Sequence, residues 1–119
     1  MTKTQTGKYG ENLAIEYLKR HGYKIIDRNF RIRGGEIDII ALEKSTLVFI
    51  EVKTRTSLRF GYPQEAVTKS KIYFLERAAK FYRNANSHKN FPILERIDVV
   101  AIDLTWDPPK IDLIKNATG

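Results

Sequence analysis

The sequence predicts an α/β domain in which helices pack on a mixed β-sheet. Three observations support this prediction. Apolar residues recur every three to four positions in two segments, they alternate or cluster in five shorter runs, and one long helical segment separates the third run from the fourth. A connection of that length can cross the sheet and make the flanking strands parallel. The predicted order is therefore α-β-β-β-α-β-β.

The 119 residues suit a single domain that closes one hydrophobic core. We expect the ordered core to cover about residues 7–115, because both ends of the chain are polar. The first helix is predicted over residues 7–21, where Tyr9 and Leu13 share one helical face. Thr6 can cap its start, and Gly22 can follow its end.

Three strands are predicted after this helix, over residues 23–30, 36–42 and 46–53. A basic, glycine-rich turn, RIRGG, joins the first two strands, and a short polar turn joins the second and third as a hairpin. Side chains alternate between the faces of a strand, so the apolar pattern also predicts the register of the hairpin. Pairing residues whose numbers sum to 89 gives a wholly apolar face, made of Ile37, Ile39 and Ala41 opposite Val52, Ile50 and Val48.

A second helix is predicted over residues 63–85, with Pro63 in its first turn. Strands are predicted to follow at residues 96–103 and 110–115. The spacing of the aromatic residues on the second helix is typical of a core-facing stripe, formed by Tyr73, Phe74, Phe81 and Tyr82.

The predicted hairpin register brings charged residues together at one end. It places Asp38 opposite Glu51, and Glu36 opposite Lys53. Like charges that face each other in a sheet repel, and a divalent cation between them would relieve this repulsion. Carboxylate oxygens are suitable ligands for Mg²⁺ or Mn²⁺. Lys53 can orient or help to deprotonate an attacking water and stabilise charge on a phosphoryl group.

The alternative is a charged rim without chemistry, in which Lys53 forms a salt bridge with Glu36 or Glu51.

The overall charge favours a site that binds phosphate groups. The net charge is +7 and the pI is about 9.7, which favours polyanionic partners such as DNA. The basic residues that follow or precede the acidic strand ends are Arg31, Arg33, Arg55 and Arg59, with Lys8 and Lys71 as further candidates on the flanking helices.

The chain contains no cysteine, which excludes disulfides and thiolate zinc sites and fits a reducing compartment. No apolar run approaches the length of a membrane span, and the first residues carry no apolar stretch of signal-peptide length. We therefore expect a soluble, cytoplasmic protein with no membrane partner.

Asp38, followed on the next strand by Glu51-Val52-Lys53, resembles the signature of the PD-(D/E)xK nuclease superfamily, with "ID" in place of "PD". Over about residues 7–103 the chain resembles the YraN family of small endonuclease-like proteins. The resemblance rests on GKYGENLAIEYLKRHGYKIIDRNFRIRGGEIDIIALEKSTLVFIEVKTR, then FGYPQEAV, Lys71 and RIDVVAID. It implies a restriction-endonuclease-like fold. Arg96-Ile97-Asp98 corresponds to the "RFD" of that family.

The chain is also similar to archaeal Holliday junction resolvases, which carry a glutamate in the first helix. This similarity implies that Glu11 approaches the metal together with Asp38 and Glu51. Glu36 has no matching role in that pattern, so we expect it to be a neighbour of the ligands or an alternative ligand.

Two functions remain open from the sequence. The first is a Mg²⁺- or Mn²⁺-dependent endonuclease that hydrolyses DNA, with branched or structured DNA as a candidate substrate by the resolvase analogy. The second is a non-catalytic nucleic-acid-binding module on a nuclease scaffold, acting as a partner in DNA processing. Cleavage of a two-fold symmetric junction would require a homodimer.

Overall fold

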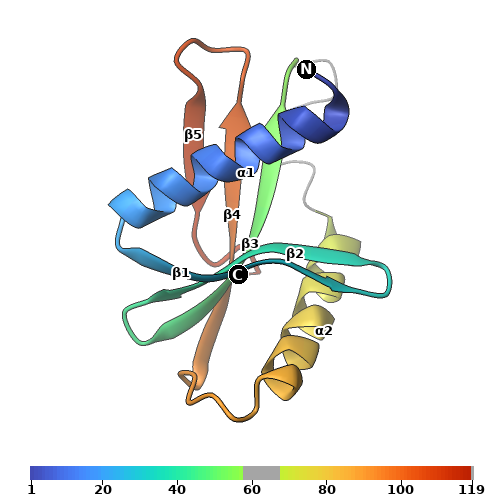
Figure 1. Cartoon of the computed structure of the whole chain (residues 1–119), viewed down its shortest axis with the longest axis vertical. Coiled ribbons are helices and arrows are strands. Elements are labelled where there is room, and N and C mark those ends of the chain that lie inside the picture. Colours follow the sequence, from blue (N-terminus) through green and yellow to red (C-terminus); the bar gives the residue numbers. More distant parts are fainter. Residues whose placement is uncertain (58–67, 119) are drawn as a thin grey trace.

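The computed structural model describes residues 1–57 and 68–118 (Figure 1). Within these residues the elements follow the predicted order, which confirms the α/β class with a mixed sheet. They are α1 (Lys3–Arg20), β1 (Tyr23–Ile32), β2 (Gly35–Glu43), β3 (Thr46–Arg55), α2 (Lys69–Ala85), β4 (Leu94–Asp103) and β5 (Lys110–Ile114). Neither of the described helices is long and apolar enough to cross a membrane.

The five strands form one sheet in the order β1-β2-β3-β4-β5. Neighbouring strands are antiparallel except for β3 and β4, which are parallel as the intervening helix predicts. Figure 1 shows that the β1–β2 hairpin runs steeply across the direction of the other three strands. The sheet is therefore strongly twisted, and its two halves meet between β2 and β3.

The two helices cover opposite faces of this sheet, so the domain has three layers (Figure 1). The layer between α1 and the sheet contains Ala14, Ile15, Leu18, Tyr23, Ile39, Ala41, Val48, Ile50, Val100 and Ile102. The layer between α2 and the sheet contains Ile37, Ile40, Leu47, Phe49, Leu75, Ala78, Ala79, Tyr82 and Ile97. Burial of these apolar side chains is the main force that holds the helices on the sheet.

Helix α1 begins at Lys3, four residues before the predicted start. Thr2, and not Thr6, is the capping residue. The Gln5 amide donates to Thr2 Oγ1 at 3.1 Å, and the Thr2 amide donates to Gln5 Oε1 at 2.8 Å. This reciprocal pair satisfies backbone donors that would otherwise be free, and it extends the helix by one turn. Gly22 follows the helix as predicted, with a φ of 87° that glycine adopts readily.

The predicted register of the β2–β3 hairpin is confirmed over most of its length. Ile39 pairs with Ile50, and the turn consists of Lys44 and Ser45. The expectation that Ile37 shares the face of Ile39 is wrong, because Ile37 packs beneath α2. On the N-terminal side of Ile39, β2 is no longer paired with β3 and pairs with β1 alone. Ribbons of only two strands twist more strongly than wider sheets, which breaks the simple alternation.

Helix α2 begins at Lys69, and the side chain of Thr68 caps it by accepting the Lys71 amide at 3.1 Å. The predicted start at Pro63 lies outside the described residues. The prediction that all four aromatic residues of α2 face the core is also wrong. Tyr82 is buried, but Tyr73 and Phe81 are 68% and 54% exposed, because the helix buries only one stripe of side chains.

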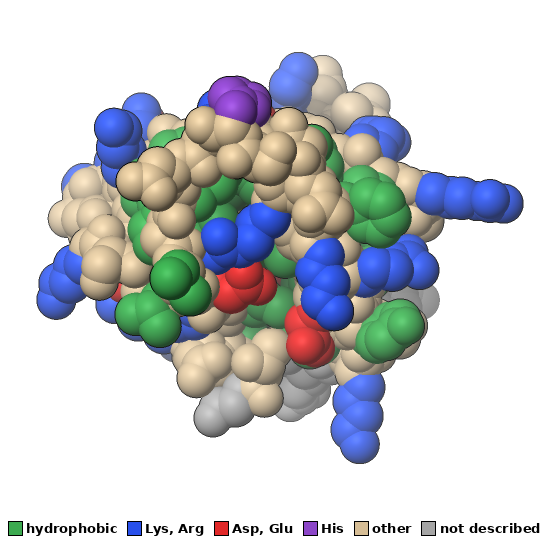
Figure 2. Space-filling model, turned by 90° about the horizontal axis from the view of Figure 1, so that it is seen from below, with side chains coloured by type: hydrophobic (Ala, Val, Ile, Leu, Met, Phe, Trp, Pro, Cys, Tyr) green, Lys and Arg blue, Asp and Glu red, His purple; other side chains and the backbone are tan. Residues whose placement is uncertain are grey.

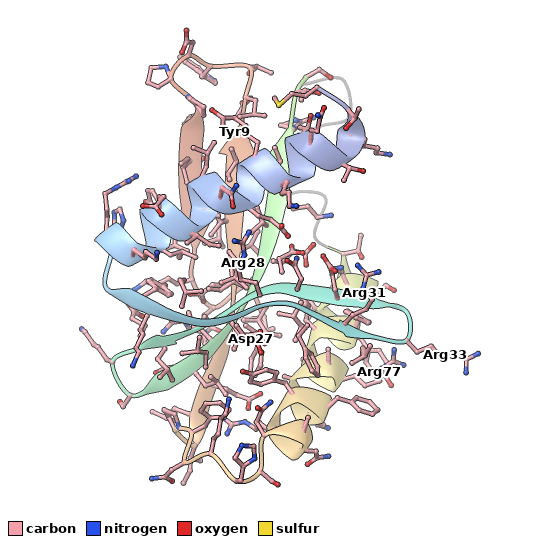
Figure 3. All side chains as sticks on the ribbon, in the orientation of Figure 1. Tyr9, Asp27, Arg28, Arg31, Arg33 and Arg77 are labelled. Carbon is pink, nitrogen blue, oxygen red and sulfur yellow. The ribbon has the colours of Figure 1, made fainter. Side chains whose placement is uncertain are left out.

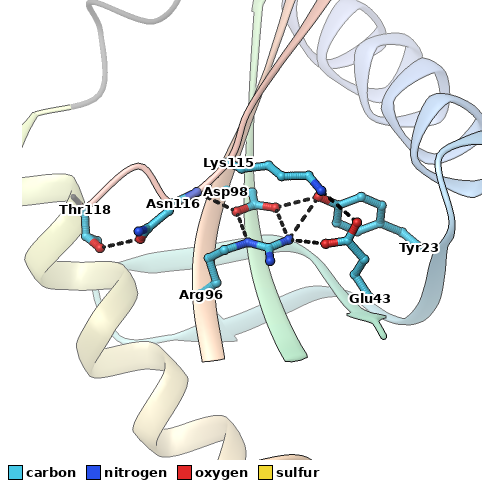
Figure 4. Close-up of polar contacts among 7 residues, drawn as sticks. All are labelled: Tyr23, Glu43, Arg96, Asp98, Lys115, Asn116 and Thr118. Carbon is cyan, nitrogen blue, oxygen red and sulfur yellow. Dashed lines mark hydrogen bonds and ion pairs between the residues drawn. The ribbon is translucent and has the colours of Figure 1, made fainter. Parts of the chain in front are cut away.

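A network of buried polar groups joins β4 to β1 and β2 (Figure 4). The fully buried Asp98 accepts hydrogen bonds from the Tyr23 hydroxyl at 2.8 Å, from Arg96 Nε at 2.7 Å and from the Asn116 amide at 2.9 Å. Arg96 Nη2 also donates to Glu43 at 2.7 Å. Although burial alone would raise the pKa of Glu43, its bonds to Lys115 and Arg96 lower it.

Helix α1 lies close against β3 at Gly10, where a Cβ atom would overlap Thr54 Oγ1. Gly7, one turn earlier, has no atom within 4 Å of such a Cβ position. We expect Gly10→Ala to lower the free energy of unfolding by about 1–3 kcal/mol because it overpacks this contact. The matched Gly7→Ala should raise it by about 0.5–1 kcal/mol because alanine is the better helix former. Urea unfolding measures both, and equal stability of the two variants would contradict the close approach.

Candidate functional site

The site lies where β2 and β3 separate. The paired register ends at Ile39 and Ile50, so Asp38 and Glu51 do not form the next pair of the ladder that the sequence predicts. Instead, the carboxylate of Asp38 bridges the opening, and its Oδ2 atom accepts the Val52 amide at 2.8 Å. This bond replaces a backbone carbonyl by a side-chain oxygen and holds Asp38 between the two strands.

Three carboxylates gather at this opening. One oxygen from each of Glu11, Glu36 and Asp38 lies within 4.8 Å of the others. Glu11 comes from α1, and the other two come from β2, so packing of the helix on the sheet assembles the group. Of the predicted metal ligands, Asp38 and Glu11 are therefore brought together. Glu36 contributes an oxygen to the same group, which agrees with its predicted place as an alternative ligand.

Asn29 of β1 ties two of these carboxylates together. Its Nδ2 atom donates to Glu11 Oε1 at 3.0 Å and to Glu36 Oε1 at 3.1 Å. The backbone of Asn29 has a φ of 52°, a left-handed conformation that asparagine tolerates better than most residues. On the other side, Arg31 Nη2 donates to Glu36 Oε2 at 2.9 Å. The partner of Glu36 is therefore Arg31, not Lys53 as the charged-rim alternative allows.

Glu51 approaches the opening from β3 and is only 4% exposed. Two lysines neutralise it: Lys53 Nζ lies 3.8 Å from Oε1, and Lys71 Nζ lies 3.5 Å from Oε2. Neither distance makes a good hydrogen bond, and Glu51 Oε2 is one of two buried side-chain polar atoms in residues 1–57 and 68–118 that have no hydrogen-bond partner. Glu51 is outside the group of three oxygens, although its charge acts on Asp38.

Burial and like charges disfavour ionisation at this site. Burial and the charge of Glu51 raise the pKa of Asp38 from 3.8 to about 8, and the bond from the Val52 amide opposes this effect only in part. Glu11 and Glu36 add smaller repulsions. Burial also raises the pKa of Glu51, against the effect of Lys71 and Lys53. The pKa values of Asp38 and Glu51 are therefore both raised, although Lys53 and Lys71 lie beside Glu51.

The donor set suits a hard divalent cation. It consists of carboxylate oxygens, which are the ligands that Mg²⁺ and Mn²⁺ prefer. Two observations favour this fit: the raised pKa of Asp38, which a cation would reverse, and the buried Glu51 Oε2 atom that no donor reaches. Asp38 connects the two parts of the site: it contributes to the group of three oxygens, and the charge of Glu51 acts on it.

The predicted phosphate-binding residues do not all lie together. Arg31 and Lys71 lie at the carboxylates through their ion pairs with Glu36 and Glu51. Figure 3 shows Arg33 projecting away from the end of the β1–β2 hairpin. Arg55 Nε donates to the Ser57 carbonyl at 2.7 Å.

Of the remaining predicted basic residues, only Lys8 lies within the described residues. Lys8 is an exposed residue of α1. Arg59 lies outside the described residues. Among residues 1–57 and 68–118, the cations that contact the carboxylates are Arg31, Lys53 and Lys71.

The comparison with known proteins identifies the family. Residues 10–102 match the profile of the group described as Uncharacterised protein family UPF0102. The chain belongs to this family. A UPF0102 protein of Caldicellulosiruptor saccharolyticus is 47% identical over 98% of this chain and 99% of its own length, and one of Dehalococcoides mccartyi is 45% identical over 98% and 95%. A UPF0102 protein of Geobacter metallireducens is 47% identical over 93% of this chain and 89% of its own length.

Sequence reasoning missed Asn29, which holds Glu11 and Glu36 in this UPF0102 protein. One signal was available, because asparagine is disfavoured within strands and often marks a left-handed residue. The neighbouring Arg28 was missed as well. Its guanidinium donates to Asn12 at 3.0 Å and connects β1 to α1 (Figure 3).

The electrostatics predict how stability depends on pH in metal-free buffer. Because the folded protein holds the Asp38 proton more tightly than the unfolded chain does, the stability linked to this proton is fully present below about pH 4 and is lost as the pH rises to about 8. Asp38→Asn removes the charge and keeps an acceptor for Val52. Its free energy of unfolding, relative to wild type, should increase by about 1 kcal/mol or more between pH 5 and pH 8.

Urea unfolding in EDTA at both pH values measures this difference. The matched control is Asp112→Asn, at an exposed aspartate of β5. A difference that stays constant between the two pH values for Asp38→Asn would contradict the repulsion inferred at the opening.

Proposed function

We propose that this protein is a metal-dependent nuclease that hydrolyses phosphodiester bonds in DNA. The observation that carries the proposal is Asp38 in the β2–β3 opening, with Glu51 acting on its charge and Lys53 two residues further along β3. The resemblance of these residues to the PD-(D/E)xK signature supports the same chemistry. Branched or structured DNA is the candidate substrate, and paired cuts across a junction would require two copies of the chain.

Asp38 and its acidic neighbours Glu11, Glu36 and Glu51 are the residues that would hold Mg²⁺ or Mn²⁺. When bound, such a cation polarises the phosphoryl group and lowers the pKa of a water molecule. Lys53 is one-third exposed and is held near Glu51, so its ammonium group can reach both solvent and the site. It can hold an attacking water by a hydrogen bond and stabilise negative charge that develops on the phosphate.

The surrounding cations favour a polyanionic substrate. The net charge is +7, and Figure 2 shows Lys and Arg side chains around much of the edge of one face of the molecule. Arg31 is 79% exposed at its side chain while its Nη2 atom contacts Glu36. A guanidinium group in this position can pair with a phosphate that approaches the carboxylates.

One observation favours the second function, a nucleic-acid-binding module without catalysis. Lys71 and Lys53 both lie beside Glu51, and Arg31 contacts Glu36, so cations of the protein already occupy part of the acidic site. In such a module these contacts would be permanent. In a nuclease, Glu51 would be among the residues that hold the cation, and Lys71 would be free to bind phosphate.

Asp38→Ala separates these two functions. Purified protein is incubated with duplex, single-stranded, flap and four-way DNA in Mn²⁺, Mg²⁺ or EDTA. We expect wild type to cleave at least one substrate only with metal, and Asp38→Ala to lose cleavage by at least about 100-fold. DNA affinity in EDTA should stay equal or rise, because the variant removes a negative charge that repels phosphate. Absence of cleavage by wild type with every metal and substrate would contradict the nuclease, and DNA binding that persists in Asp38→Ala would then favour the binding module.

Lys53→Ala tests the proposed role of the lysine. We expect kcat to fall by about 100-fold or more, with DNA affinity changed less than about twofold, because Lys53 acts on the reacting groups rather than on binding. Lys24→Ala, at an exposed lysine of β1, is the matched control and should cleave like wild type. A fall in affinity with an unchanged kcat would assign Lys53 to phosphate binding instead.

A further inference from the structure

We propose that the exposed face of α2 formed by Tyr73, Arg77 and Phe81, here called the α2 aromatic face, binds single-stranded DNA by stacking on its bases. This inference rests on the proposed function and names the kind of substrate that the site would receive. An unpaired strand would lie along α2 while its backbone reaches the carboxylates at the β2–β3 opening.

The three side chains form one stripe. They are spaced four residues apart, so they lie on the same side of the helix. Tyr73 is 68% exposed and Phe81 is 54% exposed, whereas the opposite stripe of α2 is buried against the sheet. Packing therefore does not explain why two large aromatic side chains are placed here with an arginine between them.

The α2 aromatic face is continuous with the candidate site. Arg77 Nη2 donates to the Arg33 carbonyl at 3.4 Å, which joins the face to the β1–β2 turn (Figure 3). Arg77 also lies over the Phe74 ring at 5.8 Å, and Lys71 lies over the same ring at 5.1 Å. Lys71 in turn contacts Glu51 at 3.5 Å. A series of cationic and aromatic groups thus connects Arg77, the middle residue of the stripe, to the carboxylate of Glu51.

The turn packs closely on this part of α2. A Cβ atom at Gly35, where φ is 153°, would meet the Phe74 ring at 3.1 Å. The glycine permits the β1–β2 turn to rest on the ring, which fixes the position of Arg33 relative to Arg77. The backbone of the turn is therefore packed against the part of α2 that carries Arg77.

The charge of α2 favours a nucleic acid over a second copy of the chain. In a two-fold dimer whose axis passes through the middle of this face, Arg77 would lie near its own counterpart, and like charges would repel. A polyanionic strand is complementary to it. The charged residues of α2 are Lys69, Lys71, Arg77, Lys80 and Arg83, against Glu76 alone.

Exposed rings select unpaired bases. In a duplex the faces of the bases are covered by their neighbours, whereas in a single strand they are free to stack on aromatic side chains. Arg77 between the rings can pair with a phosphate or add a cation–π contact. The α2 aromatic face should therefore contribute to binding of single strands and contribute little to binding of duplex DNA.

The test is fluorescence anisotropy in EDTA with a labelled 20-nucleotide single strand and with the blunt duplex of the same sequence. We expect the double variant Tyr73→Ala with Phe81→Ala to bind the single strand at least about tenfold more weakly, and the duplex less than about twofold more weakly. Tyr73→Phe with Phe81→Tyr should retain binding because it keeps both rings. Trp106→Ala, which removes an exposed aromatic side chain elsewhere, should bind like wild type.

Equal losses for single strand and duplex, or no loss, would overturn the proposal. A change from dimer to monomer in the double variant, measured by analytical ultracentrifugation, would overturn it in favour of self-association. The readout does not require cleavage. Failure of the stacking surface with intact metal-dependent cleavage therefore leaves the proposed function standing, and retained stacking without any cleavage points to the binding module.

Discussion

The end of the backbone ladder between β2 and β3 determines the arrangement of the candidate site. Past Ile39 and Ile50 the strands separate, and the Asp38 carboxylate accepts the Val52 amide in place of a backbone carbonyl. The opening lets a carboxylate from α1 on one face and a lysine from α2 on the other reach the same region of the sheet. A continuous ladder would keep these two layers apart, so the separation of the strands is what brings helices from both faces to one site.

The part of the chain that the structure describes contains two buried polar centres, and their hydrogen bonding differs. At the β4 centre, Asp98 is fully buried, and both of its oxygens accept hydrogen bonds from Tyr23, Arg96 and Asn116 (Figure 4). Such a saturated network is consistent with a structural role, because every buried charge has a partner. At the β2–β3 opening, by contrast, Asp38 has a raised pKa and Glu51 Oε2 has no hydrogen-bond donor. Groups that are disfavoured in this way are found preferentially at functional sites.

The sequence predicted the order of elements, the parallel β3–β4 pair and the hairpin register as far as Ile39, because these follow from local periodicity. The similarity to the resolvases, and not the periodicity, predicted that Glu11 lies near Asp38. The sequence did not predict the loss of register at Ile37, which depends on the twist of the β1–β2 ribbon after β3 separates from it. The role of Asn29 and the contact of Lys71 with Glu51 depend on tertiary packing between elements far apart in the sequence. For the same reason, spacing alone could not distinguish the exposed Tyr73 from the buried Tyr82.

Crystals soaked in MnCl₂ and measured at the manganese absorption edge would locate any bound cation from its anomalous signal. If the opening between β2 and β3 is a metal site, an anomalous peak will lie against Asp38, and Lys71 will have moved away from Glu51. A map with no peak at Asp38, and with Lys71 still beside Glu51, would contradict a metal site at this opening.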